Sequence, residues 1–315
     1  SLLAQVGLGG PREFVSYTTF VMTNREERNT SASQGEKFHN ESPAALRAGL
    51  VKDFPEITLL CSDAYLTAVL GVPNRTFEYA RDEKIGKALA WRRTFDVEAL
   101  RSRFRYDMEE GVLNLIPADE TGSANSFEPS PVLLKLAKSR ALRILPERDA
   151  DGRVVLFAET QLVKWREVTT EAFLQHHVLV LEAAFDVIRN TPGASPESIT
   201  LLVDPSGPLQ APPIAALKGM ATLMQRAYPD RIHKISVGPV NFVVRSLYRL
   251  VAHLLSKASR DKMTLVGVRP TLASLRPRSQ SDAKSASPSM ANQAQIRHDS
   301  ELSTQSPPGI RGSDS

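Results

Sequence analysis

The feature that most constrains this chain is a change of pattern near its middle. From Arg153 onward, short runs rich in β-branched residues alternate with stretches of helical periodicity. In order, these segments are RVVLFA from Arg153, EAFLQHHVLVLEAAFDVIRN from Glu171, ITLLVD from Ile199, a helix from Pro212, HKISV from His233, a helix from Val240 and KMTLVG from Lys262. Strands that alternate with helices form a sheet with crossover helices, so we expect an α/β fold.

The residues before this change predict helices. Ser42-Pro43 is a typical helix start, and a second helix begins at Ser62-Asp63 and ends at Gly71. Helical periodicity then continues from Phe77 to Arg93 and from Asp96 to Met108. We therefore expect an N-terminal helical lobe, followed by a mixed β-sheet with flanking helices.

Composition separates this body from two polar ends. The segment from Thr23 to Glu41 is a polar linker, and what precedes it could be an extended arm or a short strand. The last 46 residues contain 11 serines and no aromatic residue, which predicts a disordered tail. The expected parts are an arm and linker over 1–41, the helical lobe over 42–110, the α/β domain over 111–269 and the tail over 270–315.

Charge and cysteine content exclude several classes of protein. The chain has 39 Lys and Arg against 35 Asp and Glu, far from the dense basic surface that nucleic acids require. Its single cysteine, Cys61, cannot form an internal disulfide and favours a reducing, cytoplasmic location. No apolar run approaches the roughly 20 residues needed to span a bilayer, so a membrane would be met only from outside.

A search for catalytic motifs finds none. The chain has no nucleophile-elbow serine, no Walker loop, no zinc-binding histidine pair and no Cys-His arrangement. We therefore expect a protein that is not an enzyme, with no catalytic residues, no metal site and no cofactor.

The segment VNFVVRSLYRLVAHLLS, from Val240 to Ser256, is the most amphipathic helix that we predict. Its polar arc contains Asn241, Arg245, Ser246, Arg249, His253 and Ser256, and Phe242 and Ala252 also fall within that arc. The remaining circumference is apolar. On this pattern alone an ordinary core-facing helix is favoured, and the alternative is a lid over an apolar ligand.

Two motifs, AYPDRIHKISV (227–237) and ASRDKMTLVG (258–267), bracket that helix. Three further segments precede them in order: DAYLTAVLGVPNRTFEYARDEKIGKALAWR (63–92), DADGRVVLFA (149–158) and ITLLVDPSG (199–207). Together they resemble the CRAL-TRIO lipid-binding family, in particular its phosphatidylinositol-transfer (Sec-fourteen-like) branch. The resemblance covers roughly residues 60 to 267, and its specificity comes from five weak matches in the right order.

The departures from the family pattern are informative. The Leu-Arg-Ala-Arg-Lys-Phe element is LGVPNRTF here, which leaves Arg75 as its basic residue, and Asp230 replaces the customary glutamate. Branch members that also carry phosphatidylcholine have hydroxyl side chains where this chain has Ile199 and Leu201, which argues against a choline lipid. After Gly267 the end of the domain departs from the pattern and is expected to be shortened.

The resemblance implies an apolar lipid pocket enclosed by the helices and the sheet, with a bound phospholipid in place of a cofactor. The residues expected to bind the head group are Asp230, Arg231, Lys262, Ser259 and Arg75. The gate helix and pocket would be formed by Val240, Phe242, Val243, Leu247, Leu250, Val251, Leu254, Met220, Met224, Ile199 and Leu201. Methionines suit such a lining because their side chains adapt to flexible tails.

The function implied is that of a lipid-binding and lipid-transfer protein. It would take up phosphatidylinositol and exchange or present it at membranes, as a cytoplasmic protein with transient, peripheral membrane association. The flexible ends could recruit protein partners. Two alternatives stay open: a carrier of another hydrophobic ligand, such as a retinoid, a tocopherol or a sterol-like molecule, and a ligand-free adaptor for protein interactions.

Overall fold

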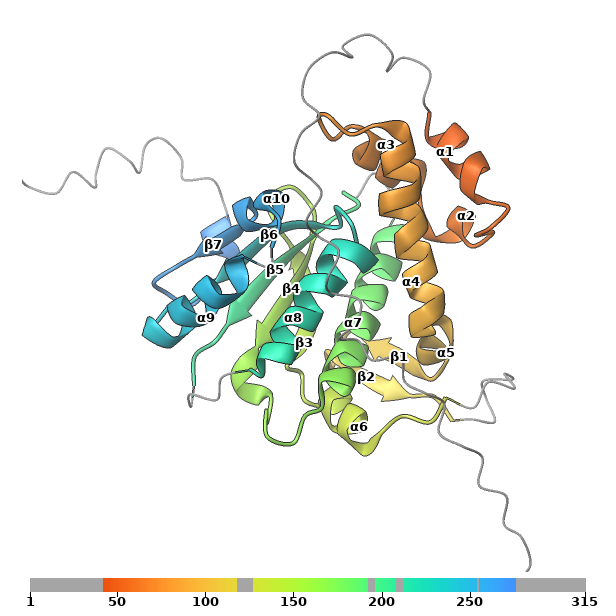
Figure 1. Ribbon diagram of the computed structural model, residues 1–315. Coiled ribbons are helices and arrows are strands. Elements are labelled where there is room, and N and C mark those ends of the chain that lie inside the picture. The colour runs from red at the N-terminus through yellow and green to blue at the C-terminus, as the bar shows by residue number, and fades with distance from the viewer. Residues whose placement is uncertain (1–41, 118–126, 192–195, 208–211, 254, 276–315) are drawn as a thin grey trace, which may run out of the picture. The chain divides into compact units, whose positions relative to one another are not determined.

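A computed structural model of the protein describes residues 42–117, 127–191, 196–207, 212–253 and 255–275 (Figure 1). Residues 1–42 and 43–315 form two separate units, and of the first unit only Ser42 is described. The arm and linker predicted for residues 1–41 therefore lie outside the described residues. The same is true of the predicted tail from residue 276 onward.

The N-terminal part of the second unit is a helical lobe with its own small core. Its elements are α1 (Pro43–Leu50), α2 (Ile57–Leu60), α3 (Asp63–Leu70), the π-helix η3 (Tyr79–Gly86), α4 (Lys87–Phe95) and α5 (Val97–Ser102). The Ser62 hydroxyl accepts a hydrogen bond from the Tyr65 backbone N–H at 3.1 Å, which fixes the start of α3 as its sequence predicts. Leu46, Ile57 and Leu66 are fully buried between these helices.

The helix predicted from Asp96 to Met108 is only half correct. After α5 the chain forms the hairpin β1 (Phe104–Asp107) and β2 (Val112–Leu115), whose strands pair antiparallel. The Asp107 carboxylate accepts hydrogen bonds from the backbone N–H groups of Glu109 and Glu110, and Gly111 adopts a φ of 69°. This local turn chemistry reverses the chain and outweighs the helical periodicity.

The body contains a five-stranded sheet in the order β3-β4-β5-β6-β7. Its strands are β3 (Leu142–Arg148), β4 (Val154–Glu159), β5 (Ile199–Asp204), β6 (Ile232–Val237) and β7 (Met263–Leu265). β3 pairs antiparallel with β4, and β4 to β7 are parallel. The α/β class with a mixed sheet and flanking helices is confirmed, although β3 was not anticipated.

Helices follow the strands as parallel pairing requires. The body contains α6 (Pro131–Lys138), η4 (Thr160–Leu162), α7 (Thr170–Asn190), α8 (Ile214–Thr222), the π-helix η5 (Leu223–Ala227), α9 (Phe242–Ala252), α10 (Lys257–Asp261) and η6 (Leu272–Leu275). α7 and α8 lie on the same face of the sheet (Figure 1). Right-handed crossovers place successive helices of a parallel sheet on one face, so α9 belongs to this face as well.

The described chain continues in folded form past the predicted start of the tail. Pro270 is buried, and Leu272 packs against the opposite face of the sheet. The Arg269 guanidinium forms ion pairs with Glu159 and Asp204, each at 2.6 Å, at the ends of β4 and β5. Residues 270–275 are therefore part of the body rather than of the tail.

Candidate functional site

The sheet face that packs on α7 and α8 is apolar but unevenly covered. The register places Leu156, Leu201, Ile235 and Met263 in one row across β4 to β7. Leu156 and Leu201 are buried, with 1% and 8% of their surface exposed, whereas Ile235 and Met263 are only half-buried. Burial thus falls along the row from β4 to β7.

A second row of the same face repeats this partial burial. It consists of Ala158, Val203, Val237 and Leu265, all of which are half-buried. On the β6–β7 half of the face, the apolar side chains therefore keep part of their surface exposed to solvent. Ile199 and Leu201 were predicted for this floor. The β6 and β7 side chains were not, although the alternation within each strand could have indicated them.

The amphipathic helix α9 contributes little to the core. None of its described side chains is buried, and the side chain of Val251 and all of Leu254 lie outside the described residues. Val243, Val244 and Leu247 are half-buried, as expected for a face turned towards the sheet. The ordinary core-facing helix that pattern alone favoured would have buried this face.

Two residues predicted for the pocket lie elsewhere. Phe242 exposes 80% of its surface and Leu250 exposes 42%, so neither lines an interior space here. Phe242 is the first residue of α9 and falls on the polar arc of the helix, which explains why its ring faces solvent. Only the family resemblance had placed it in the gate and pocket set.

The other predicted pocket residues lie at or near the sheet. Ile199 is fully buried, and Met220 and Met224 are half-buried against the main core. Val240 is half-buried and donates its backbone N–H to the Val266 carbonyl at 3.0 Å, which joins the start of α9 to the end of β7.

Three of the residues predicted to bind the head group come together where β6 and β7 begin. Arg75 Nη1 donates to Asp230 Oδ2 at 2.6 Å and to the Val69 carbonyl at 2.9 Å. Lys262 immediately precedes β7, and the charges of both Asp230 and Arg75 act on its ammonium group. Residues more than 150 positions apart in sequence thus form one group, which we call the Arg75–Asp230–Lys262 cluster.

The electrostatics of this cluster single out Lys262. Burial lowers the pKa of Lys262, Asp230 opposes that change, and Arg75 adds to it. Within the described part of the chain, Arg75 and Asp230 are ion-paired, whereas Lys262 has no carboxylate within ion-pair distance. A half-buried ammonium group without a close counter-charge suits an anionic ligand.

The backbone at Asp230 also shapes the cluster. Asp230 has a φ of 59°, in the left-handed region that aspartate enters at lower cost than most residues. The loop is further held by Tyr65, whose hydroxyl donates to the Pro229 carbonyl at 2.8 Å.

Arg231 and Ser259 have other partners. The Arg231 side chain, only 7% exposed, pairs with Glu197 at 2.5 Å and donates to the Leu60 carbonyl at 3.0 Å. Its guanidinium also stacks on the Tyr65 ring, 3.5 Å from the ring centre. Ser259 instead shares a hydrogen bond with the Ser256 hydroxyl at 2.9 Å. We therefore leave Arg231 and Ser259 out of the cluster.

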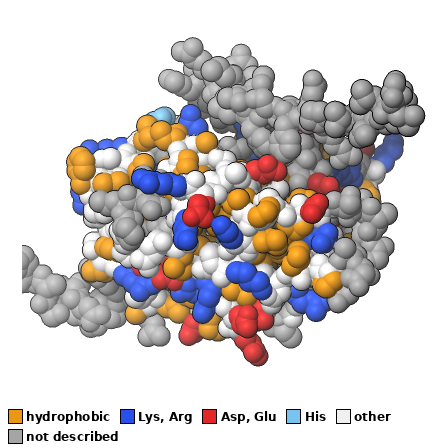
Figure 2. Space-filling view, turned by 90° about the horizontal axis from the view of Figure 1, so that it is seen from below, with side chains coloured by type: hydrophobic (Ala, Val, Ile, Leu, Met, Phe, Trp, Pro, Cys, Tyr) orange, Lys and Arg blue, Asp and Glu red, His pale blue; other side chains and the backbone are white. Residues whose placement is uncertain are grey.

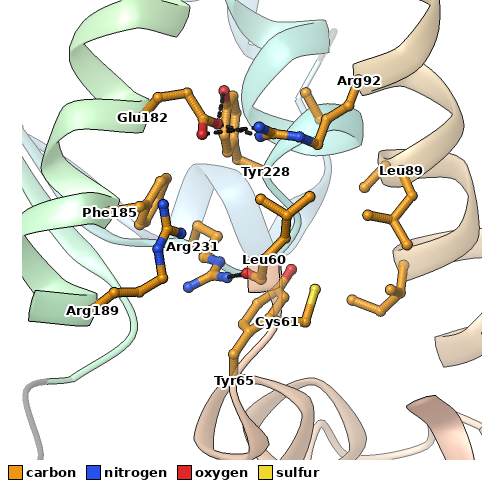
Figure 3. Close-up of a pocket in the computed structure, with 13 residues that line it drawn as sticks. Leu60, Cys61, Tyr65, Leu89, Arg92, Glu182, Phe185, Arg189, Tyr228 and Arg231 are labelled. Atoms are coloured by element: carbon orange, nitrogen blue, oxygen red, sulfur yellow. Dashed lines mark hydrogen bonds and ion pairs between the residues drawn. The ribbon is translucent and has the colours of Figure 1, made fainter. Parts of the chain in front are cut away.

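A buried charge network joins the helical lobe to α7. Arg92 on α4 pairs with Glu182, which also accepts a hydrogen bond from the Tyr228 hydroxyl at 2.7 Å and an ion pair from Arg101 at 3.2 Å. Burial alone would raise the pKa of Glu182, but Arg92 and Arg101 hold it below its ordinary value. Figure 3 shows Arg92 and Glu182 pointing towards one another.

The same junction contains a small cavity of about 40 Å³, lined by Cys61, Tyr65 and Arg231 among others (Figure 3). This volume suits one or two waters, not a lipid. A larger, more open hollow of about 740 Å³ lies between α5, β1 and α7. Apart from Arg231, no residue predicted for the lipid site lines either space, so the expected enclosed pocket is not one of these two cavities.

Among the described residues, no helix is long and apolar enough to cross a membrane. No three His, Cys, Asp or Glu side chains within the described ranges gather as a metal site.

Part of the chain is similar to a known protein family. Residues 139–283 match the sequence profile of the CRAL/TRIO domain. Over these residues, which make up slightly less than half of the chain, the protein is similar to that family. This match confirms the family resemblance for the α/β body and continues past Gly267, where the end of the domain was expected to be shortened. It begins at Ser139, so the resemblance of the helical lobe stays a prediction.

Comparison with curated proteins and with solved structures adds less than this family match. No curated protein matches the chain. The crystal structure of Sfh5 is similar, with 16% sequence identity and a TM-score of 0.49, over 73% of this chain and 82% of that chain. The CRAL/TRIO family binds lipid ligands, so the domain supports a lipid-binding protein with a lipid as its partner.

Proposed function

We propose that the protein binds phosphatidylinositol and exchanges or presents it at membranes without covalent chemistry. The observation that carries the proposal is the half-buried Lys262 without a close counter-charge, beside the Arg75–Asp230 ion pair. A phosphodiester accepts hydrogen bonds from an ammonium group, and inositol hydroxyls donate to a carboxylate. Lys262 would then hold the phosphate, Asp230 the inositol ring, and Arg75 would orient Asp230.

The half-buried apolar side chains of β6, β7 and α9 would contact the acyl tails of the lipid. A two-chain phospholipid has about 30 methylenes at roughly 0.8 kcal/mol each, so exposing its tails to water would cost on the order of 25 kcal/mol. The half-buried apolar face of α9 and the floor around Ile235 and Met263 are suited to replace the bilayer around such tails. Movement of α9 away from the sheet would admit them.

The buried lone thiol of Cys61 agrees with a reducing, cytoplasmic location, and exchange between membranes needs only transient contact with each surface. Acyl burial is nearly equal in protein and bilayer, so selectivity would come from the head group. Charge-assisted hydrogen bonds contribute about 1.5 to 3 kcal/mol each, which corresponds to roughly a tenfold to hundredfold preference.

The test is extraction of labelled lipid from vesicles by the purified protein. Lys262→Ala should lower the extraction of phosphatidylinositol at least about tenfold, since it removes the phosphate contact. Lys257→Ala, on the exposed side of α10, is the matched control and should extract lipid like the wild type. Equal extraction by the Lys262 and Lys257 variants would refute the assignment.

A second variant separates the two halves of the head group. Asp230→Asn keeps the size of the side chain and tolerates the left-handed backbone. It should reduce the preference for phosphatidylinositol over phosphatidic acid, which has a phosphate but no inositol. An unchanged preference would mean that Asp230 does not contact the ring.

A carrier of an uncharged hydrophobic ligand is the second candidate. It is favoured by the wholly apolar floor, where Ile199 and Leu201 stand in place of hydroxyl side chains. Native mass spectrometry of the copurified ligand separates the two functions by mass. A protein that is stable and empty would favour the adaptor instead.

A further inference from the structure

Large hydrophobic side chains exposed to solvent gather at one edge of the sheet. Leu162, Phe242 and Val268 come shortly after the C-terminal ends of β4, β6 and β7, and Ile214 opens α8, the helix that follows β5. They expose 43%, 80%, 68% and 48% of their surfaces, respectively. Because β4 to β7 are parallel, the segments that follow them lie at the same edge. We call these four residues the apolar rim.

Contacts between these segments hold the edge together. The Gly238 N–H donates to the Val203 carbonyl at 3.0 Å, and Val240 is bonded to Val266. A Cβ atom added to Gly238 would come within 2.3 Å of the Val268 carbonyl oxygen, so the segments after β6 and β7 are in direct contact. The backbone that carries the exposed side chains is therefore held in place by hydrogen bonds and close contacts between these segments.

The surroundings of the apolar rim are positively charged. The segments 160–170, 212–222, 238–249 and 266–275 contain six cationic side chains and one acidic side chain, Glu167, and one of the cations, Arg269, is ion-paired with Glu159 and Asp204 at the ends of β4 and β5. The cations are Lys164, Arg166, Lys218, Arg245, Arg249 and Arg269. Seen from below the view of Figure 1, hydrophobic side chains lie beside lysines and arginines, with several acidic side chains among them (Figure 2). Apolar side chains among cations complement the interface of an anionic bilayer.

The apolar rim and the Arg75–Asp230–Lys262 cluster occupy opposite ends of the same strands. Asp230 and Lys262 precede β6 and β7, whereas Phe242 and Val268 follow them. β6 has six residues and so spans about 20 Å, comparable with the roughly 15 Å of hydrocarbon in one bilayer leaflet. A lipid with its head group at the cluster would extend its tails towards the apolar rim.

This arrangement preserves the orientation of a lipid during transfer. In a leaflet beneath the apolar rim, each lipid already points its head group towards the protein and its tails away. A lipid that leaves the leaflet head first reaches the cluster without turning over. The lipid can therefore move straight along the bilayer normal, from the apolar rim at the C-terminal ends of the strands to the cluster at their N-terminal ends.

We propose that the apolar rim is the membrane-docking surface, which inserts into the interfacial layer of an anionic bilayer so that lipid enters the protein head first. This inference rests on the proposed lipid exchange and adds the docking surface and the direction of entry. It places the bilayer at the C-terminal edge of β4 to β7, away from the head-group cluster.

The test compares two triple variants of the full chain in co-sedimentation with phosphatidylcholine vesicles that contain phosphatidylserine. The rim variant carries Leu162→Ser, Ile214→Ser and Val268→Ser. The control carries Val51→Ser, Leu59→Ser and Met108→Ser, three similarly exposed hydrophobic residues away from the rim. The rim variant should lose vesicle binding at least about tenfold and the control should bind like the wild type. Equal loss in both, or no loss in the rim variant, overturns the proposal.

Loading from detergent micelles separates this inference from the proposed function. The rim variant should still take up phosphatidylinositol from micelles, whereas Lys262→Ala should bind vesicles normally and fail to load. If the wild type binds vesicles through the rim but loads no lipid, the docking surface stands and the proposed function fails. If the wild type is a dimer by sedimentation velocity and the rim variant a monomer, the rim is a contact between copies and the docking proposal is wrong.

Discussion

The two halves of one sheet face are covered in different ways. On the β4–β5 half, Leu156 and Leu201 are buried within the main core together with much of α7. On the β6–β7 half, Ile235 and Met263 are half-buried, and α9 has no buried side chain among those described. Packing on the first half stabilises the fold, whereas the second keeps apolar surface for a ligand. The predictions below test this division, from the largest expected effect to the smallest.

The largest effect is expected at the charge network on α7. Glu182→Ala would leave the buried guanidinium of Arg92 without its partner and remove the acceptor of the Tyr228 hydroxyl. Loss of one member of a buried ion pair lowers the free energy of unfolding by about 4 kcal/mol. Urea denaturation measures this change in the free energy of unfolding, with Glu83→Ala in the exposed Glu83–Lys87 pair as the control. A loss below about 1 kcal/mol would show that the network is dispensable.

A truncation pair compares the two halves directly. Leu156→Ala should lower the free energy of unfolding by about 3 kcal/mol, because it leaves a cavity in a packed core. Met263→Ala, in the same row of the sheet but only half-buried, should lower it by about 1 kcal/mol or less. The same denaturation experiment measures both. Equal losses would contradict the division.

Acid should destabilise the α7 half selectively. Burial lowers the pKa of His176 to about 3 from an ordinary value of 6.5, so below that value the unfolded chain binds the proton more readily. Stability should therefore fall as pH decreases from 6.5 towards 3, by about 1.4 kcal/mol per pH unit for this group. His176→Leu should make the decline shallower, and the neighbouring His177, whose pKa is also lowered by burial, to about 4, should account for part of what remains. His253→Leu, at the exposed residue that follows α9, is the control, and an equal decline in both variants would exclude His176 as the cause.

The smallest effect is expected at Lys262 and has the opposite sign. Because burial lowers its pKa, the charged side chain is less favourable in the folded chain than in the unfolded one. Lys262→Met should raise the free energy of unfolding by about 0.5 kcal/mol, allowing for its partial solvent exposure, while lipid extraction falls. Calorimetry beside the extraction assay measures both. A loss of stability would mean that Lys262 serves the fold.

Much of this architecture could be predicted from the sequence, because strand and helix periodicities are local signals. The alternation from Arg153 predicted the α/β body, and the hairpin at Phe104–Leu115 was missed because a turn at Asp107 and Gly111 overrides a helical pattern. β3 escaped notice because its apolar run is short.

The candidate site was harder to predict, because side chains that are adjacent in the sequence contact different parts of the fold. Asp230 and Arg231 are adjacent, yet one reaches Arg75 and the other is buried against Tyr65 and Glu197. Only tertiary contacts decide this, and the motif alone assigned both to the head group. The partial burial of Ile235 and Met263 depends likewise on what α9 leaves uncovered.

The lone cysteine provides a natural probe of how firmly the helical lobe stays docked. Cys61 is 5% exposed at the lobe junction, and burial raises the pKa of its thiol to about 11. A thiol reagent needs both access and the thiolate, so at neutral pH labelling should wait for the lobe to separate from α7. Since the chain has no other cysteine, the labelling rate reports on this one opening motion. An untagged, unmutated protein can therefore show whether lipid loading locks or loosens the lobe.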